Sequence, residues 1–307
     1  MGELNSQDNS VLKGYLAYLE RSHSYSTSMS YYLDCKYYLG YLNLTKGPRY
    51  TEIDNLKSST SETVDAYLNI LRETKSHATV YRVAVSIRNF YKYLVASKII
   101  DNVPTFGTTL PIPQFHTPEV LTKAQMRLLI NSVDTSSEMG ARGKAMLLIM
   151  YYTGAKATDV LEMKVGDVDF HSREIILKSN SDIKTDLIFS LDGETINALE
   201  DYLEYRRKHC TPTSDDPLFT SLKDAKLTRQ SVWKIIRRCA EESPLELKIG
   251  PNTIRNTMAY HLLESGVSSQ RVSSILGNQA LDNIRKFMEL LPKSDEHIIR
   301  THELLSI

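Results

Sequence analysis

Cysteines and long apolar segments are scarce in this 307-residue sequence. The three cysteines, Cys35, Cys210 and Cys239, are far apart and odd in number, so they predict reduced thiols rather than a disulfide framework or a zinc site. No apolar run approaches the roughly 18 residues that a membrane span needs, and the longest, 145–152, is typical of a core helix. The first ten residues are polar and acidic, unlike a signal peptide. We therefore expect a cytoplasmic protein without a membrane partner.

An excess of charge of either sign is also absent, since 37 Lys and Arg residues balance 37 Asp and Glu residues. This balance excludes a histone-like polybasic protein but not nucleic-acid binding, because partners respond to local fields. Two stretches are locally basic: residues 75–98 hold five cations and no acid, and residues 223–238 hold six cations against Asp224. Each stretch alone is typical of a solvated helix face, but two of them in two helical domains favour a DNA clamp.

Motifs for metal binding, nucleotide binding and serine nucleophiles are missing. The eight histidines include no HExxH pair and show no ligand spacing on one helix face. The sequence has no glycine-rich phosphate loop of the GxGxxG or GxxxxGK type and no GxSxG elbow. We therefore expect neither a metal site nor a cofactor.

Helical periodicity dominates the first third of the chain. Apolar residues recur at three- and four-residue spacing through residues 11–101, which predicts an all-α domain of four helices. Residues 1–10 are expected to form a flexible N-terminus. Residues 102–118 contain four prolines, which cannot propagate a helix and predict a stiff, extended linker.

The remaining residues predict a second domain with a little β-structure. Within residues 119–292, two short β-branched runs at 169–177 and 187–191 indicate a hairpin, and the other periodic segments indicate helices. Residues 293–307 predict a separate amphipathic C-terminal helix. The predicted fold class is mainly α, with a four-helix N-terminal domain and a mixed α+β domain that carries a small antiparallel sheet.

An ordered series of segments resembles the tyrosine recombinase and phage integrase family, in its bacterial chromosome-dimer-resolving branch. The first signature of the family is similar to YYTGAKATDVLEMKVGDVDF at 151–170, and the helix that follows is similar to LTRQSVWKIIRRCAEE at 227–242. The family's His-x-x-Arg segment and Leu-Gly-His turn are similar to residues 249–278. The resemblance covers about residues 11–290. It implies a core-binding N-terminal domain, a recombinase-type second domain and double-stranded DNA as the partner.

The resemblance also implies a metal-free reaction in which a tyrosine hydroxyl attacks a DNA phosphate. Two arginines then stabilise the charge on phosphorus, while a histidine pair and a hairpin lysine handle protons. Here the first arginine position holds Lys156, and the His-x-x-Arg histidine is Asn252. The second arginine is retained as Arg255. The hairpin lysine corresponds to Lys178 or Lys184, and the sequence leaves both open.

The two remaining catalytic positions are changed as well. The histidine after Leu-Gly is replaced by Asn278, and the nucleophilic tyrosine by Phe287. A phenyl ring has no atom that attacks phosphorus, and the last tyrosine of the chain, Tyr260, lies upstream of this position. The sequence therefore predicts a pseudo-recombinase with a degenerate active site and no intact catalytic set.

Positive residues persist at both arginine positions, which favours retained DNA binding because backbone contact needs only charge. The expected DNA-binding residues are Arg82, Arg88, Lys92, Lys156, Arg229, Lys234 and Arg255. Trp233, the only tryptophan, is interpreted as helix packing. Residues 293–307 are expected to exchange with another copy or with an active recombinase. Two alternatives stay open: an active recombinase with a non-standard nucleophile, and an interaction scaffold that has lost DNA binding.

Overall fold

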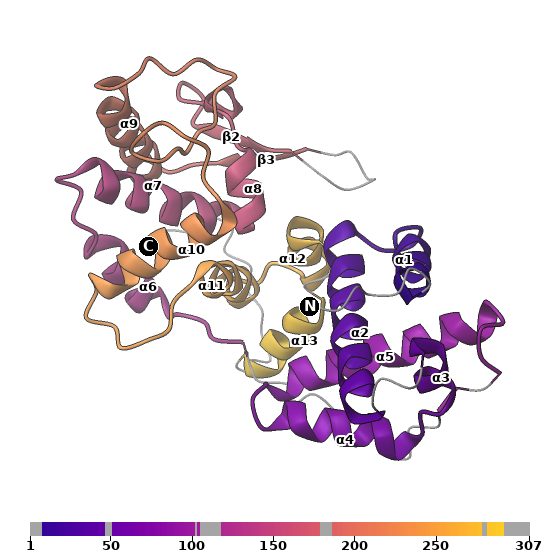
Figure 1. Ribbon diagram of the computed structural model, residues 1–307. Helices are drawn as coiled ribbons and strands as arrows, with labels where there is room; N and C mark the ends of the chain where they lie inside the picture. Colours follow the sequence, from indigo (N-terminus) through magenta and orange to yellow (C-terminus); the bar gives the residue numbers. More distant parts are fainter. Residues whose placement is uncertain are drawn as a thin grey trace. The chain divides into compact units, whose positions relative to one another are not determined.

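The computed structural model (Figure 1) describes residues 8–46, 51–101, 103–104, 118–178, 186–277 and 281–291. The chain divides into two compact units, Met1–His116 and Thr117–Ile307, and each unit has its own hydrophobic core. Most of the predicted flexible N-terminus and of the predicted linker, and all of the predicted helix 293–307, lie outside the described residues. None of the described helices is long and apolar enough to cross a membrane.

The described part of the first unit is built from helices. They are α1 (Asp8–Leu19), α2 (Tyr25–Lys46), α3 (Glu52–Lys57), α4 (Ser61–Arg72) and α5 (His77–Ala96). The sequence predicted four of these and missed α3, because six residues are too few to show a helical repeat. A capping box marks the start of α3, where the Thr51 hydroxyl accepts from the Asp54 N–H and the Asp54 carboxylate accepts from the Thr51 N–H.

The second unit combines helices with one small sheet. Its helices are α6 (Lys123–Asn131), α7 (Glu138–Thr153), α8 (Ala157–Glu162), the 3-10 turn η1 (Val165–Asp167), α9 (Gly193–Arg207), α10 (Arg229–Glu241), α11 (Pro251–Glu264), α12 (Ser269–Leu276) and α13 (Leu281–Leu290). Its strands are β1 (Val168–Asp169), β2 (Glu174–Leu177) and β3 (Leu187–Ser190), paired antiparallel in the order β1-β2-β3. The predicted mainly α fold with a small antiparallel sheet is confirmed.

The predicted hairpin forms between β2 and β3, with Ile175 opposite Phe189 and Leu177 opposite Leu187. The run 169–177 is not one strand, however, because the chain turns after Asp169. The Asp169 carboxylate accepts from the backbone N–H groups of His171 and Ser172 at 2.8 and 3.0 Å, a local pattern that competes with extended structure. This turn produces the short first strand of the sheet.

Helix α7 is the centre of the second core, as its apolar run predicted. Every residue from 145 to 152 is buried, and the helix contacts α9, α10 and α11. It ends at Gly154, which has a left-handed φ of 64°. A Cβ at this glycine would lie 2.9 Å from a methyl carbon of Leu276, so both the backbone conformation and the space exclude a larger residue.

Candidate nucleic-acid interface

One groove of about 1140 Å³ in the second unit brings together five of the nine site residues predicted for that unit. Segments that are distant in sequence line it: the start of α8, one face of α10, the first turns of α11, and α13. The predicted residues that line it are Lys156, Arg229, Asn252, Arg255 and Phe287. The groove is therefore the candidate site of this unit.

Arg255 holds two segments of this groove in place. Its guanidinium Nη1 and Nη2 donate hydrogen bonds to the backbone carbonyls of Gly154 and Leu276. These carbonyls lie at the C-terminal ends of α7 and α12, where the helix dipole favours a cation. Burial lowers the pKa of Arg255, while the charge of Asp159 acts in the opposite direction. Arg255 thus fixes the chain just before Lys156.

Lys156 and Asn252 are the two exposed substitutions in the groove. Lys156 is the residue before α8, and its backbone N–H donates to the Asp159 carboxylate at 2.8 Å. Asn252 follows Pro251, which occupies the first position of α11. Asn252 and Arg255 are three residues apart on this helix, so they share one face. The groove therefore presents a cationic side chain and an amide at the two positions that the resemblance relates to an arginine and a histidine.

Phe287 is a core residue whose ring borders the groove. Its side chain is 1% exposed, and the ring packs edge-on against Tyr260 with centroids 6.0 Å apart. Nearby, the Asn283 side-chain amide donates to the Asn256 carbonyl oxygen at 3.4 Å. Phe287 therefore contributes an apolar ring, without a hydroxyl group, to this part of the groove.

Helix α10 contributes four residues at four-residue spacing, Arg229, Trp233, Arg237 and Glu241. Trp233 is 46% exposed, and the Arg237 guanidinium lies 5.3 Å from its ring centroid, within cation–π range. The interpretation of Trp233 as helix packing is therefore wrong: the indole lies on the groove face. Its other contact is with Gly250, where an added Cβ would lie 3.2 Å from the indole nitrogen.

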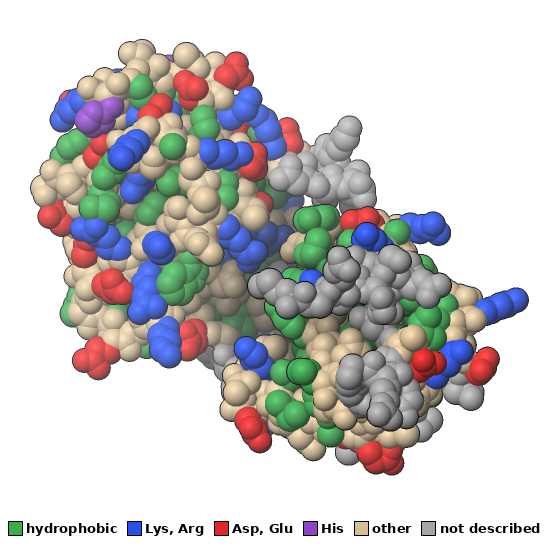
Figure 2. Space-filling view, in the orientation of Figure 1, with side chains coloured by type: hydrophobic (Ala, Val, Ile, Leu, Met, Phe, Trp, Pro, Cys, Tyr) green, Lys and Arg blue, Asp and Glu red, His purple; other side chains and the backbone are tan. Residues whose placement is uncertain are grey.

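Sequence reasoning also missed Arg237, although a signal was present. Residues at positions i, i+4 and i+8 share a helix face, so Arg229 predicts Trp233 and Arg237 as its neighbours. Figure 2 shows Lys and Arg side chains interspersed with acidic ones over the face of this unit that carries α10. Basic and acidic side chains are thus mixed on this face, in agreement with the balanced total charge of the chain.

The other predicted residues of the second unit lie elsewhere. Lys234 lines a separate cavity, because its position on α10 differs from that of the groove residues. Lys178 forms an ion pair of 2.6 Å with the buried Asp167 carboxylate, and this hydrogen bond raises the pKa of Lys178. Lys184 and Asn278 lie outside the described residues. Among the residues with described positions, no three His, Cys, Asp or Glu side chains gather as a metal site.

In the first unit, the three predicted DNA-binding residues are on α5 and lie on two faces of that helix. Arg82 forms an ion pair with Asp34, a buried carboxylate that also accepts from the Ser86 hydroxyl at 2.7 Å. Burial raises the pKa of Asp34, while Ser86 and Arg82 lower it. Arg88 and Lys92 are four residues apart and share another face of the helix. Arg82 therefore has a structural partner inside its own unit.

Comparison with known proteins agrees with this arrangement of motifs. Residues 119–292 match the Phage integrase family. The chain belongs to this family. It is 31% identical over 271 residues to a putative tyrosine recombinase of Caldanaerobacter subterraneus subsp. tengcongensis, covering 87% of this chain and 89% of that protein. It is 31% identical to the tyrosine recombinase XerD of Listeria monocytogenes serotype 4b, covering 88% of this chain and 90% of that protein.

Solved structures of integrase-family proteins share the fold. The XerH site-specific recombinase bound to a palindromic difH substrate matches with a TM-score of 0.69 at 17% identity, covering 94% of this chain and 95% of XerH. A lambda integrase dimer bound to a core site matches with a TM-score of 0.67 at 16% identity, covering 94% of this chain and 98% of that one. At these identities the likeness concerns the fold alone.

Proposed function

We propose that this phage-integrase-family protein binds double-stranded DNA without cleaving it. The observation that carries the proposal is the composition of the groove: five cationic side chains line it against Glu241 and Glu246, and its lining includes the Phe287 ring, which packs against Tyr260. Relatives are named as tyrosine recombinases, and the XerH and lambda integrase structures contain DNA. Membership of the family supports DNA as the substrate. The side chains of the groove support the inference that this protein binds DNA without cleaving it.

Charge in the groove supports phosphate binding. Lys156, Arg229, Arg237 and Lys248 are exposed, and Arg255 is held at the base by two carbonyls. Lysine and arginine contacts to phosphate need charge and reach but no proton transfer. An immobilised guanidinium loses little side-chain entropy when it binds, so Arg255 is organised for this contact in advance.

The same groove lacks the groups for strand cleavage. Lys156 offers a point charge where the family has a planar fork, and one lost donor of this kind costs about a hundredfold to a thousandfold in rate. Asn252 forms hydrogen bonds but does not exchange a proton near neutral pH. Phe287 supplies no nucleophile. Together these changes would abolish strand cleavage while leaving DNA binding possible.

The test compares two variants of α10 in a fluorescence anisotropy assay with random-sequence duplex. Arg229→Gln removes a groove cation, and Lys234→Gln removes an exposed cation that lines the other cavity. We expect the first to weaken DNA binding by about fivefold to tenfold and the second to leave it unchanged. Equal losses in both would show that the groove is not the binding surface.

A suicide DNA substrate tests the absence of cleavage. Covalent protein on a denaturing gel would overturn the proposal in favour of an active recombinase with a non-standard nucleophile. Absence of duplex binding at low salt would overturn it in favour of an interaction scaffold. Binding that weakens steeply with salt and leaves no covalent product is the expected result.

A further inference from the structure

A second cavity, of about 380 Å³, lies against the face of α10 that carries Lys234 and Arg238. Its walls come from α7, α10 and the loop between Ser221 and Leu227, and they are largely apolar. The apolar side chains are Val133, Met139, Leu222, Leu227 and Ile235. The volume falls in the range of about 300–1,000 Å³ that small-molecule sites occupy. One ordered water takes only about 30 Å³, so this space is larger than a hydration site.

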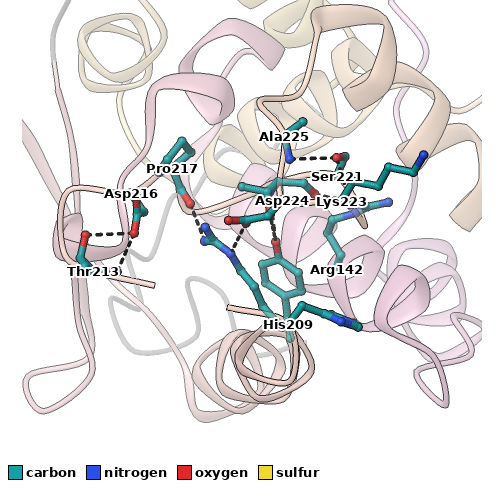
Figure 3. A network of polar contacts seen from close by, with 12 residues as sticks. Arg142, His209, Thr213, Asp216, Pro217, Ser221, Lys223, Asp224 and Ala225 are labelled. Carbon is teal, nitrogen blue, oxygen red and sulfur yellow. Dashed lines mark hydrogen bonds and ion pairs between the residues drawn. The ribbon is translucent and has the colours of Figure 1, made fainter. Parts of the chain in front are cut away.

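The unusual residue in the lining of this cavity is Arg142. Its side chain is buried, with the whole residue 6% exposed, and Nη1 donates to the Thr220 carbonyl at 2.7 Å. Figure 3 shows Arg142 beside the loop that carries Ser221 and Asp224. Within the described residues the Arg142 Nε has no hydrogen-bond partner and Arg142 takes part in no ion pair, although the charge of Glu138 acts on it. Buried charges are normally paired, because an unpaired one costs several kcal/mol.

Two further cations border the same space. Arg238 is neutralised by Glu242 at 3.3 Å, and that carboxylate also accepts from the Asp134 N–H at 3.1 Å. Lys234 forms no ion pair with any residue that the structure describes, and it is exposed at the edge of the cavity. Arg142 and Lys234 are thus two positive charges that pair with no described carboxylate, around a largely apolar space.

We propose that this cavity binds a carboxylate attached to a compact aliphatic group, either as a free acid or as the acidic end of a peptide. The carboxylate pairs with Arg142 and Lys234, and its two oxygens supply acceptors for the orphaned Nε and for the ammonium group. The aliphatic group fills the space between Val133, Leu222 and Ile235. The apolar walls offer few partners to a cluster of waters, which favours an amphipathic anion.

The proposal is independent of DNA binding, because the cavity and the groove lie on different faces of α10. The groove uses Arg229, Trp233 and Arg237, whereas the cavity uses Lys234 and Arg238. A ligand in the cavity touches α7 and α10 together. It therefore stabilises the helix pair without entering the DNA-binding groove.

The test measures binding of three probes to the full chain by ligand-observed NMR. The probes are 4-methylpentanoate, its neutral amide, and the peptide N-acetyl-Gly-Gly-Leu. We expect the acid or the peptide to bind about tenfold or more tightly than the amide, since the charge-assisted contacts are lost in the amide. Binding of the peptide alone identifies a peptide terminus as the source, and binding of both identifies a small acid as sufficient.

Variants then assign the binding to the cavity. Lys234→Gln and Leu222→Asp change exposed residues and preserve the core, and each is expected to weaken acid binding about tenfold. Arg229→Gln on the groove face is the matched control, and we expect it to leave the affinity for the acid unchanged. Equal binding of acid and amide, no binding of either acid or peptide, or insensitivity to both variants would overturn the proposal.

Discussion

Arg255 is occupied by structural contacts that Lys156 and Asn252 do not have. Its donors satisfy the carbonyls of Gly154 and Leu276, two groups that helix ends leave unpaired. Leaving such buried acceptors without partners costs about 1–3 kcal/mol each. This contact gives a physical reason for an arginine at this position whether or not the neighbouring residues perform chemistry, whereas exposed Lys156 and Asn252 are under no such constraint.

Restoring the nucleophile alone should not restore cleavage. Phe287→Tyr supplies a hydroxyl, but Lys156 and Asn252 remain, and each missing donor is worth about a hundredfold to a thousandfold in rate. We therefore expect no covalent adduct with a suicide substrate on a denaturing gel. The control is the same variant combined with Lys156→Arg and Asn252→His, for which any gain should be larger. Robust cleavage by Phe287→Tyr alone would show that the other substitutions matter little.

His261 predicts a loss of stability in acid. The ring is buried, its Nδ1 lies 2.8 Å from the Tyr151 hydroxyl, and burial lowers its pKa from 6.5 to about 4. The unfolded chain therefore binds the proton more readily, so stability is fully present above pH 6.5 and falls as pH decreases toward 4. We expect a loss of about 2–3 kcal/mol in the free energy of unfolding across this range.

Urea unfolding at pH 7.5 and pH 4.5 measures this effect. The comparison is between His261→Gln, which should flatten the pH dependence, and the exposed His171→Gln, which should not. The same slope in both variants would assign the acid sensitivity to other groups.

At the scale of elements, α10 separates two surfaces. Arg229, Trp233 and Arg237, which are spaced by four residues, line the groove. Lys234 and Arg238, each one position further along the helix than a groove residue, line the second cavity. Six cations between 223 and 238 look like one basic stripe in the sequence, yet those on α10 divide between these surfaces. Arg237 and Arg238 are additionally paired with Glu241 and Glu242 at i,i+4 spacing.

Trp233 provides a direct report of groove occupancy. It is the only tryptophan, it is 46% exposed, and it lies beside Arg237. We expect duplex DNA to change its emission and to reduce its quenching by acrylamide, because the bound duplex covers the indole. The signal should reverse at high salt as the phosphate contacts dissociate. Unchanged emission under conditions where anisotropy shows binding would place the DNA elsewhere.

At the scale of the whole molecule, zero formal charge means that DNA affinity depends on a few local cations. The first unit offers Arg88 and Lys92 on one face of α5, and the second offers the groove. Residues 1–107 hold 12 basic and 10 acidic residues, and the whole chain holds 37 of each. Neither unit is therefore strongly basic as a whole. Association should therefore be strongly salt-dependent despite a neutral total.

The salt dependence tests whether both units contact DNA. Each phosphate-facing cation contributes about one unit to the slope of log K against log salt. We expect Lys92→Gln and Arg229→Gln each to reduce the slope by about one, and the double variant by about two, because the residues belong to different units. A slope that responds to only one of the two substitutions would restrict DNA contact to that unit.

The sequence by itself determined the fold class and the family, and it carries the proposal for the active-site positions. Helical spacing and ordered motifs are local properties, so the order of residues along the chain is enough to propose motif positions for Lys156, Asn252, Arg255 and Phe287. The proposal that a phenyl ring stands in place of a nucleophilic hydroxyl likewise rests on the sequence and needs no tertiary structure.

Only the tertiary structure decided how these residues are used. Spacing shows which side chains share a helix face, but it does not show which face is covered or by what. The exposure of Trp233, the separation of Lys234 from Arg229 and the pairing of Arg82 with Asp34 depend on packing between segments distant in sequence. The unpartnered Nε of Arg142 is a property of the same kind, since burial and missing partners exist only once the chain is folded.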